Sequence, residues 1–268
     1  MRKPWILACT LTVAVSGTVM GYAGLGADLT PVVSSSTQDD TPSAKERFEA
    51  LETEASEARS EWVTKLRAAR AAEEPFEESD PTPSFIPRFQ EGAKEFAGTE
   101  GAVPFLRWLA FSAMRSDAKV SSASYMTLLR DHGTSPEMTS LASTFGDASR
   151  FVGDDIDEAV GYLKKIAANH ADAGVKAWAT FGAHASTIET AAVDSDEFTA
   201  AEAAITNALE GIDDDRLKSV TGKAIGVRKK FSLGMVAPDI SGPDLSGNEF
   251  KLSDYRGKVV FLDFWGDW

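Results

Sequence analysis

The sequence predicts a mainly α-helical protein whose last residues begin a different, α/β fold. Between residues 88 and 231 no segment alternates as a half-buried strand does, whereas apolar residues recur every three or four positions, as in amphipathic helices. The same spacing covers residues 44–74 and predicts one long helix there. Residues 259–264, in contrast, include five apolar residues of six, mostly β-branched or aromatic, which is typical of a strand buried on both faces.

The net charge of the chain limits which classes of molecule it is expected to bind. The chain has 268 residues, enough for two modest domains, and a formal net charge of -14. Such an acidic surface repels phosphates, so we expect no nucleic-acid partner. The one local basic run, Arg228-Lys229-Lys230, is interpreted as the favourable C-terminus of a helix.

Residues 1–27 have the form of a secretory signal peptide. Arg2 and Lys3 precede an apolar stretch from Trp5 to Met20, and small residues suited to cleavage follow. We therefore expect export across the inner membrane to the periplasm or another extracytoplasmic space, with a membrane tether if the signal stays uncleaved. Cys9 is the only cysteine. The cleaved chain would have none, so neither a disulfide framework nor cysteine redox chemistry is expected within these residues.

A polar flexible linker is predicted over residues 28–43, before the long amphipathic helix of 44–74. Ser43 and Glu46 have the spacing of a capping box at the helix start. Two fates are open for its apolar stripe, a coiled coil or packing on the domain that follows. The stripe consists of Phe48, Leu51, Ala55, Ala58, Trp62, Leu66 and Ala69. Four prolines then predict an extended connector over residues 75–87.

The helical domain of residues 88–231 is clearest in one predicted helical hairpin. Asp154 or Asp155 would cap its first helix, and residues 169–172 form the turn. The inward faces are predicted to be Ile156, Ala159, Val160, Leu163, Ile166 and Ala167, then Val175, Trp178, Phe181, Ala185 and Ile188. Such pairs are the unit of α-solenoids, but no fixed repeat period is present, so solenoid-like stacking stays open.

Chemistry-bearing residues are sparse in the helical part. His132, His170 and His184 lack partners at zinc-site spacing, and His170 is expected to be exposed in its turn. The run Asp213-Asp214-Asp215 lacks the glycine and glutamate of a calcium loop and suits a helix N-terminus. No phosphate-binding glycine loop occurs. We therefore expect no metal and no cofactor in this part.

The segment 232–268 is predicted to form a hairpin, one turn and a buried strand. The hairpin turn lies in residues 244–250, where Gly247 can take a positive φ. Asp263 lies inside the strand. A carboxylate in a buried strand is costly unless it is paired or protonated, so Asp263 is either a functional acid or a structural group satisfied by a neighbour.

The stretch Gly257-Lys258-Val259-Val260-Phe261-Leu262-Asp263-Phe264-Trp265-Gly266-Asp267-Trp268 resembles the strand that leads into the active site of thioredoxin-like proteins. The resemblance is strongest to the extracytoplasmic TlpA-like branch of the redoxin superfamily. Residues 234–239 and 252–258 also match the opening of that family. The resemblance covers about 35 residues and implies a truncated thioredoxin-like domain over 232–268.

Several roles follow from the resemblance alone. It implies thiol-disulfide exchange with a protein dithiol or disulfide partner, with the nucleophile expected immediately after Trp268. It also implies that Asp263 is a buried proton acceptor and that Trp265 and Trp268 flank the redox pair. The 268-residue chain, which lacks that pair, is therefore expected to be inactive. One hypothesis for its end is a UGA codon for selenocysteine after Trp268; the alternatives are a contig edge, a frameshift or a designed truncation.

Two other functions stay open. A peroxiredoxin has a similar opening, but it would carry a proline and a threonine shortly before its reactive cysteine, and residues 264–268 contain neither. A secreted, non-enzymatic interaction module would use the helical part to bind a protein partner. A gene that continues into a cysteine pair would favour the enzyme.

Overall fold

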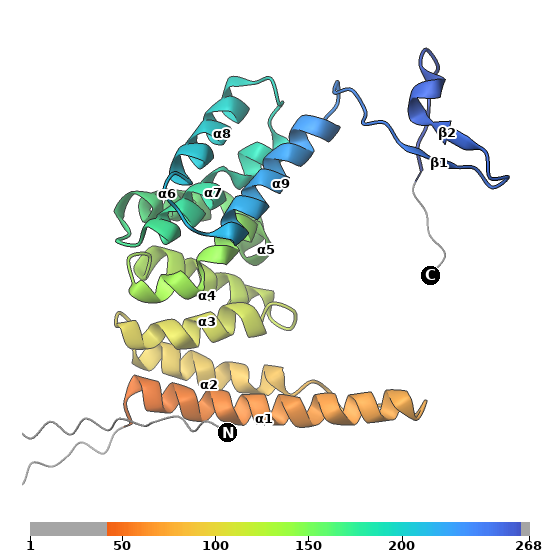
Figure 1. Cartoon of the computed structure of the whole chain (residues 1–268). Coiled ribbons are helices and arrows are strands. Elements are labelled where there is room, and N and C mark those ends of the chain that lie inside the picture. The colour runs from red at the N-terminus through yellow and green to blue at the C-terminus, as the bar shows by residue number, and fades with distance from the viewer. Residues whose placement is uncertain (1–41, 264–268) are drawn as a thin grey trace, which may run out of the picture. The chain divides into compact units, whose positions relative to one another are not determined.

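The computed structural model describes residues 42–263, which are mostly helical as predicted (Figure 1). The predicted signal peptide (1–27) and all but the end of the linker (28–43) lie outside the described residues. Within them, no helix is long and apolar enough to cross a membrane. The main helices are α1 Ala44–Ala71, α2 Thr82–Glu95, α3 Val103–Ser112, α4 Ala118–Asp131, α5 Ser149–Val152, α6 Ile156–Asn169, α7 Ala173–Thr190, α8 Asp196–Ala208 and α9 Asp215–Phe231.

Helix α1 begins with the predicted capping box. The Ser43 hydroxyl accepts a hydrogen bond from the Glu46 backbone, while the Glu46 carboxylate accepts one from the Ser43 backbone at 2.9 Å. Phe48, Leu51 and Ala55 are buried in a cluster that also holds side chains of α2 and α3. Packing on the following helices is therefore the observed fate of the first half of the stripe. The helix ends at Ala71, three residues before the predicted end at Glu74.

The segment after α1 folds back along the same helix. The Trp62 indole donates a hydrogen bond of 2.8 Å to the carbonyl of Glu78 and meets the Phe76 ring edge-on, with 5.9 Å between ring centroids. Arg59 pairs with Asp80 at 2.6 Å. These contacts hold residues 72–81 against the second half of α1.

The connector predicted over 75–87 is wrong in its last residues, because α2 begins at Thr82. Its first proline, Pro83, lies in the first turn, where no intrahelical N–H is needed. Pro87 lies inside the helix and removes one backbone hydrogen bond, at a cost of about 3 kcal/mol. Burial of large apolar side chains, each stabilising by roughly 1.5–3 kcal/mol, offsets this cost. The buried side chains are Phe85, Ile86 and Phe89.

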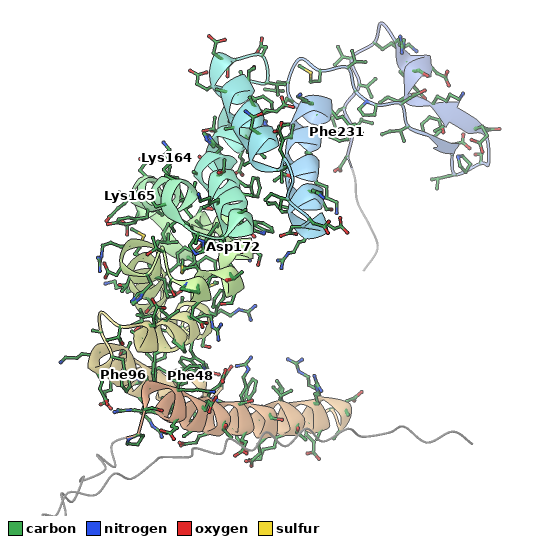
Figure 2. All side chains as sticks on the ribbon, turned by 60° about the vertical axis from the view of Figure 1, so that its left-hand side comes forward. Phe48, Phe96, Lys164, Lys165, Asp172 and Phe231 are labelled. Atoms are coloured by element: carbon green, nitrogen blue, oxygen red, sulfur yellow. The ribbon has the colours of Figure 1, made fainter. Side chains whose placement is uncertain are left out.

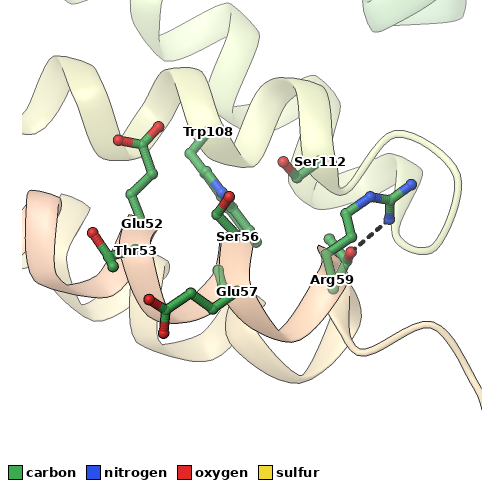
Figure 3. A pocket seen from close by; sticks show the side chains of 9 residues that line it. Glu52, Thr53, Ser56, Glu57, Arg59, Trp108 and Ser112 are labelled. Atoms are coloured by element: carbon green, nitrogen blue, oxygen red, sulfur yellow. Dashed lines mark hydrogen bonds between the residues drawn. The ribbon is translucent and has the colours of Figure 1, made fainter. Parts of the chain in front are cut away.

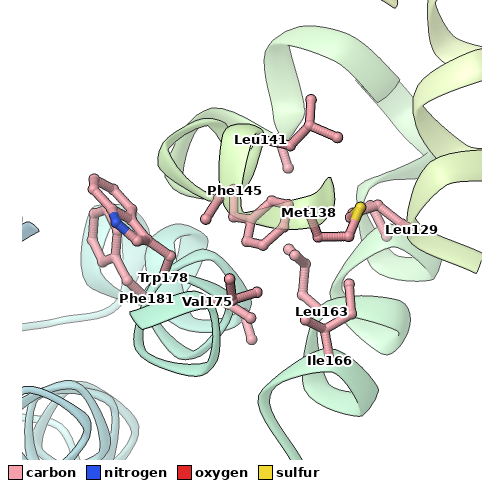
Figure 4. Close-up of a cluster of buried hydrophobic side chains, with 14 of the residues drawn as sticks. Leu129, Met138, Leu141, Phe145, Leu163, Ile166, Val175, Trp178 and Phe181 are labelled. Carbon is pink, nitrogen blue, oxygen red and sulfur yellow. The ribbon is translucent and has the colours of Figure 1, made fainter. Parts of the chain in front are cut away.

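Helix α3 contributes to two separate apolar clusters. Phe105 and Leu109 belong to the smaller cluster, with residues of α1 and α2. Leu106 and Ala110 belong to the larger one, which extends from α3 to α9. Figure 4 shows the middle of the larger cluster, with Met138 and Phe145 among the labelled side chains. The two clusters therefore lie on different sides of α3, which is ten residues long.

The predicted hairpin of α6 and α7 is confirmed. Ala159, Leu163 and Ile166 are buried on α6, whereas Lys164 and Lys165 are exposed and labelled in Figure 2. On α7 the buried residues include Val175, Trp178, Phe181 and Ile188. The Asp172 side chain caps α7 by accepting from the Val175 backbone at 2.8 Å. Asp155 occupies the N-cap of α6, but its side chain forms no capping bond.

Small residues of α7 allow the short η3 helix, Ala142–Asp147, to lie directly against it. A Cβ atom added at Gly182 would lie 2.5 Å from the Phe145 carbonyl oxygen, so only glycine fits. Between α4 and α6 the chain passes through η2 Pro136–Ser140, η3, α5 and η4 Gly153–Asp155. These short segments separate the packed pair α3 and α4 from the packed pair α6 and α7, and solenoid-like stacking stays a prediction.

Candidate functional site

The C-terminal segment forms the predicted hairpin from residues that favour a tight turn. Strands β1 (Ser241–Pro243) and β2 (Glu249–Lys251) pair antiparallel, with Gly242 opposite Phe250. The Asp244 carboxylate accepts from the backbone of Ser246 and of Asn248, both at 2.8 Å. Gly247 has a φ of +83°, as predicted. The backbone hydrogen bond from Asn248 is the main reason that the pKa of Asp244 lies below its usual value.

A second carboxylate joins the start of this segment to the turn after the hairpin. Asp239 accepts from the backbone and the hydroxyl of Ser253, both at 2.8 Å. The Leu252 N–H donates to the carbonyl of Ile240, also at 2.8 Å. Ser253 belongs to η5, Leu252–Tyr255, a short helical turn at the place where the sequence predicts a turn. The two bonds from Ser253 lower the pKa of Asp239, and the backbone bond contributes most.

The buried strand predicted at 259–264 is not observed over residues 259–263. These residues have no strand pairing and are all exposed, with Val259 at 103% and Phe261 at 92%. The physical reason is a lack of partners. A strand is buried when neighbouring strands take its backbone hydrogen bonds and helices cover its faces, and β1 and β2, the described strands, pair with each other.

Asp263 therefore lies in an exposed segment, not in a buried strand. Trp265, Trp268 and the expected position of the nucleophile lie outside the described residues. The structure thus brings none of the predicted site residues together. Before the predicted site, the structure describes a hairpin, a helical turn and the unpaired chain that continues to Asp263.

His170 is held by hydrogen bonds to the backbone of Asp172 and of Ser135. His170, predicted to be exposed, is 2% exposed. Its Nδ1 accepts from the Asp172 backbone at 3.0 Å, so Nε2 carries the proton and donates to the Ser135 carbonyl at 3.0 Å. The ring contacts the carbonyl of Ser135, whose hydroxyl donates instead to Glu100. This arrangement ties the α6–α7 turn to the loop after α4 and does not activate the serine.

The other two histidines also lie away from any metal-binding group. His132 is buried at the end of α4, and His184 is half-buried on α7, at the boundary position that the sequence indicates. Desolvation lowers the pKa of His184. Among residues 42–263, no three His, Cys, Asp or Glu side chains come together as a metal site would require. Asp214 of the acidic run caps α9, as the helix N-terminus interpretation expects.

A pocket of about 470 Å³ lies between α1 and α3 (Figure 3). Glu52, Glu57, Arg59 and Trp108 line it. The dashed contact in Figure 3 is the hydrogen bond of 2.8 Å from Arg59 to the Thr82 hydroxyl. The pocket holds the carboxylates of Glu52 and Glu57 but no histidine or cysteine, and among the described residues no hydrogen bond joins either carboxylate to the hydroxyl of Ser56 or Ser112. It offers no catalytic arrangement.

Comparison with known proteins finds similarity over short stretches. One stretch is 60% identical over 37 residues to the thiol-disulfide oxidoreductase ResA of Geobacillus kaustophilus, covering 14% of this chain and 21% of that protein. The ResA of Geobacillus thermodenitrificans is 57% identical over 37 residues, with the same coverage. The ResA of Bacillus subtilis is 44% identical over 41 residues, which is 15% of this chain and 23% of that protein.

The chain thus spans about a fifth of the length of these relatives. No family model matches the chain. No solved structure gives a significant match. The short matches support a relationship to thioredoxin-like thiol-disulfide oxidoreductases.

Proposed function

We propose that the whole protein carrying this sequence is an exported thiol-disulfide oxidoreductase of the TlpA-like branch. Residues 232–268 would begin its redox domain, and the signal-like residues 1–27 would direct it out of the cytoplasm. The single observation that carries the proposal is the 60% identity over 37 residues to a ResA protein.

The proposed chemistry needs two thiols, or a selenol and a thiol. The first, as thiolate or selenolate, attacks a disulfide sulfur of the protein substrate and forms a mixed bond, releasing one substrate thiolate. The second then attacks this bond, releasing the other substrate thiolate and leaving the enzyme oxidised. The only cysteine among the 268 residues is Cys9, so these residues do not contain the pair. Asp263 would hold and transfer the proton of the second group, with Trp265 and Trp268 flanking the pair.

The test is the reduction of insulin disulfides by the product of the complete gene. We expect turnover that is lost when the first redox residue becomes serine. We also expect Asp263→Asn to shift the pH dependence of the rate, because the second thiol would lose its proton acceptor. An exposed carboxylate of strand β2 that forms no side-chain hydrogen bond or ion pair within the described residues, changed in Glu249→Gln, is the matched control and should leave the pH profile unchanged. Peroxide reduction that outpaces disulfide exchange would instead support the peroxiredoxin alternative.

A non-enzymatic interaction module is the second candidate, and one observation favours it. The buried clusters are built from residues 48–225 without any residue of 232–263, so the helical part has apolar cores of its own. If the complete gene product shows neither disulfide nor peroxide reduction, the thioredoxin-like segment is a remnant and the helical part performs the function.

A further inference from the structure

A groove of about 480 Å³ lies between α7 and α9, and nothing in the proposed redox chemistry uses it. Side chains of α7 form its floor: Trp178, Phe181 and Ile188, which are all buried. Trp178 and Phe181 are labelled side by side in Figure 4. On α9, Val220 and Val227 border the groove and are 38% and 54% exposed. We call this surface the α7–α9 groove.

The α9 side of the groove has a regular pattern. Arg216, Val220, Lys223 and Val227 follow one another at steps of four, three and four residues, which places them on one helix face. Basic and apolar side chains therefore alternate along the rim. The pattern is unusual in a chain with a net charge of -14, where most of the surface is expected to be acidic.

Neither basic group of the rim forms an ion pair within residues 42–263. Arg216 lies over the Trp178 ring, 5.9 Å from its centroid, and close enough to the Asp214 carboxylate for its charge to help lower the pKa of Asp214. Lys223 has an exposed side chain. Arg228, deeper in the groove, donates to the carbonyls of Ile188 and Ala191 at 2.9 and 2.6 Å. Its charge thus stabilises the end of α7 but is not neutralised.

We propose that the α7–α9 groove binds an acidic amphipathic helix of a partner protein. Val220 and Val227 are two turns apart and would receive apolar side chains at positions i and i+7 of that helix. Carboxylates between those positions would pair with Arg216 and Lys223. A membrane surface fits less well, because the groove is concave. Asp147 and Glu189 also line the groove and would repel acidic groups, so the carboxylates of the partner helix must face Arg216 and Lys223. The inference rests on the helical part and not on the redox proposal.

The probe is a fluorescein-labelled 14-residue peptide with leucine at positions 1, 4, 8 and 11, glutamate at 2, 5, 9 and 12, and alanine elsewhere. Fluorescence anisotropy with the 268-residue chain should give saturable binding. The same peptide with lysine in place of glutamate, or serine in place of leucine, should bind at least tenfold more weakly. Loss of binding in 0.5 M NaCl would confirm the charge contribution, since salt screens exposed ion pairs.

Two exposed lysines of α9 provide a matched pair of variants. Lys223→Glu should weaken binding at least tenfold, whereas Lys218→Glu, on the other side of the helix, should change it less than twofold. Val227→Asp should also weaken binding at least tenfold. Circular dichroism of each variant should match the unaltered chain, because these side chains are exposed.

Four results would overturn the proposal. The first is no saturable peptide binding up to about 1 mM. The second is equal weakening by Lys218→Glu and Lys223→Glu. The third is that the chain sediments with anionic phosphatidylglycerol vesicles and that Lys223→Glu abolishes this sedimentation but leaves peptide binding unchanged. That result would assign the surface to lipid. The fourth is concentration-dependent dimerisation that Val227→Asp abolishes, which would assign it to a second copy.

Discussion

Asp214 joins two helices, and its removal should therefore destabilise the helical part at two points at once. One carboxylate oxygen accepts from the Leu217 backbone at 2.9 Å and so caps α9. The other accepts from the Trp178 indole of α7 at 2.8 Å. Loss of an N-cap costs about 1 kcal/mol, and an indole N–H left without an acceptor costs about 1–3 kcal/mol. Since Trp178 is only 4% exposed, water replaces the lost acceptor poorly.

We therefore expect Asp214→Ala to lower the free energy of unfolding by roughly 2–4 kcal/mol, the sum of these two contributions. For a domain of this size, where 1 kcal/mol shifts Tm by about 2–4 °C, that corresponds to a fall in Tm of about 4–16 °C. The assay is urea and thermal unfolding followed by circular dichroism at 222 nm. Asp214→Asn retains one acceptor oxygen and should lose roughly half as much stability. Asp213→Ala is the control. Its side chain is fully exposed and lies 3.8 Å from Lys218, so its effect should stay within about 0.5 kcal/mol.

The pH dependence gives a second check of the same contact. The hydrogen bond from the Leu217 backbone contributes most to lowering the pKa of Asp214, and the Trp178 indole adds to it. Because the folded pKa lies below the unfolded one, the stabilisation is complete above the unfolded value, near pH 4, and is lost as pH falls through the folded pKa. The difference between the unaltered chain and Asp214→Asn should therefore narrow below pH 4. An Asp214→Ala protein as stable as the unaltered chain would refute the reasoning.

Three further outcomes are expected. Gly182→Ala should lower the free energy of unfolding in urea by at least about 2 kcal/mol, because its Cβ would meet the Phe145 backbone. The control is Gly161→Ala, whose Cβ meets no atom within 4 Å and which should be neutral or stabilise by up to about 1 kcal/mol. Equal effects of the two substitutions would contradict the close approach of Gly182 to Phe145. Ser43→Ala should cost about 1 kcal/mol and increase amide exchange in the first turn of α1, and unchanged exchange there would argue against the cap. The 268-residue chain should reduce insulin no faster than buffer, and activity that survives Cys9→Ser would contradict this.

The sequence predicts those elements whose burial is decided by their immediate neighbours. The α6–α7 hairpin follows from spacing alone, because each helix buries its apolar face on the next. The start of α1 and the turn at Gly247 also follow from local hydrogen bonds, at Ser43 and Asp244. In each case the determining contacts lie within a few residues or in the adjacent helix.

Predictions were wrong where the structure of a segment depends on contacts with residues far away in the sequence. Pro87 indicated an extended chain, but burial of Phe89 and its neighbours against α1 and α3 outweighed one lost hydrogen bond. His170 is buried because the loop after α4 presents the Ser135 carbonyl to it, which no local pattern could reveal. The segment 259–263 has the composition of a buried strand, yet composition does not provide the neighbours that burial requires. For the same reason the role of Asp263 stays a prediction.

Helix α3 determines whether unfolding of the N-terminal helices α1 and α2 also unfolds the helices that follow. Because Phe105 and Leu109 face one cluster while Leu106 and Ala110 face the other, removal of α1 and α2 would expose one side of α3 without removing its second set of contacts. The N-terminal helices can therefore open as a separate cooperative unit, at a lower free energy than global unfolding. Native-state hydrogen exchange would then report lower protection in α1 and α2 than in α6 and α7, with α3 at the boundary between the two levels.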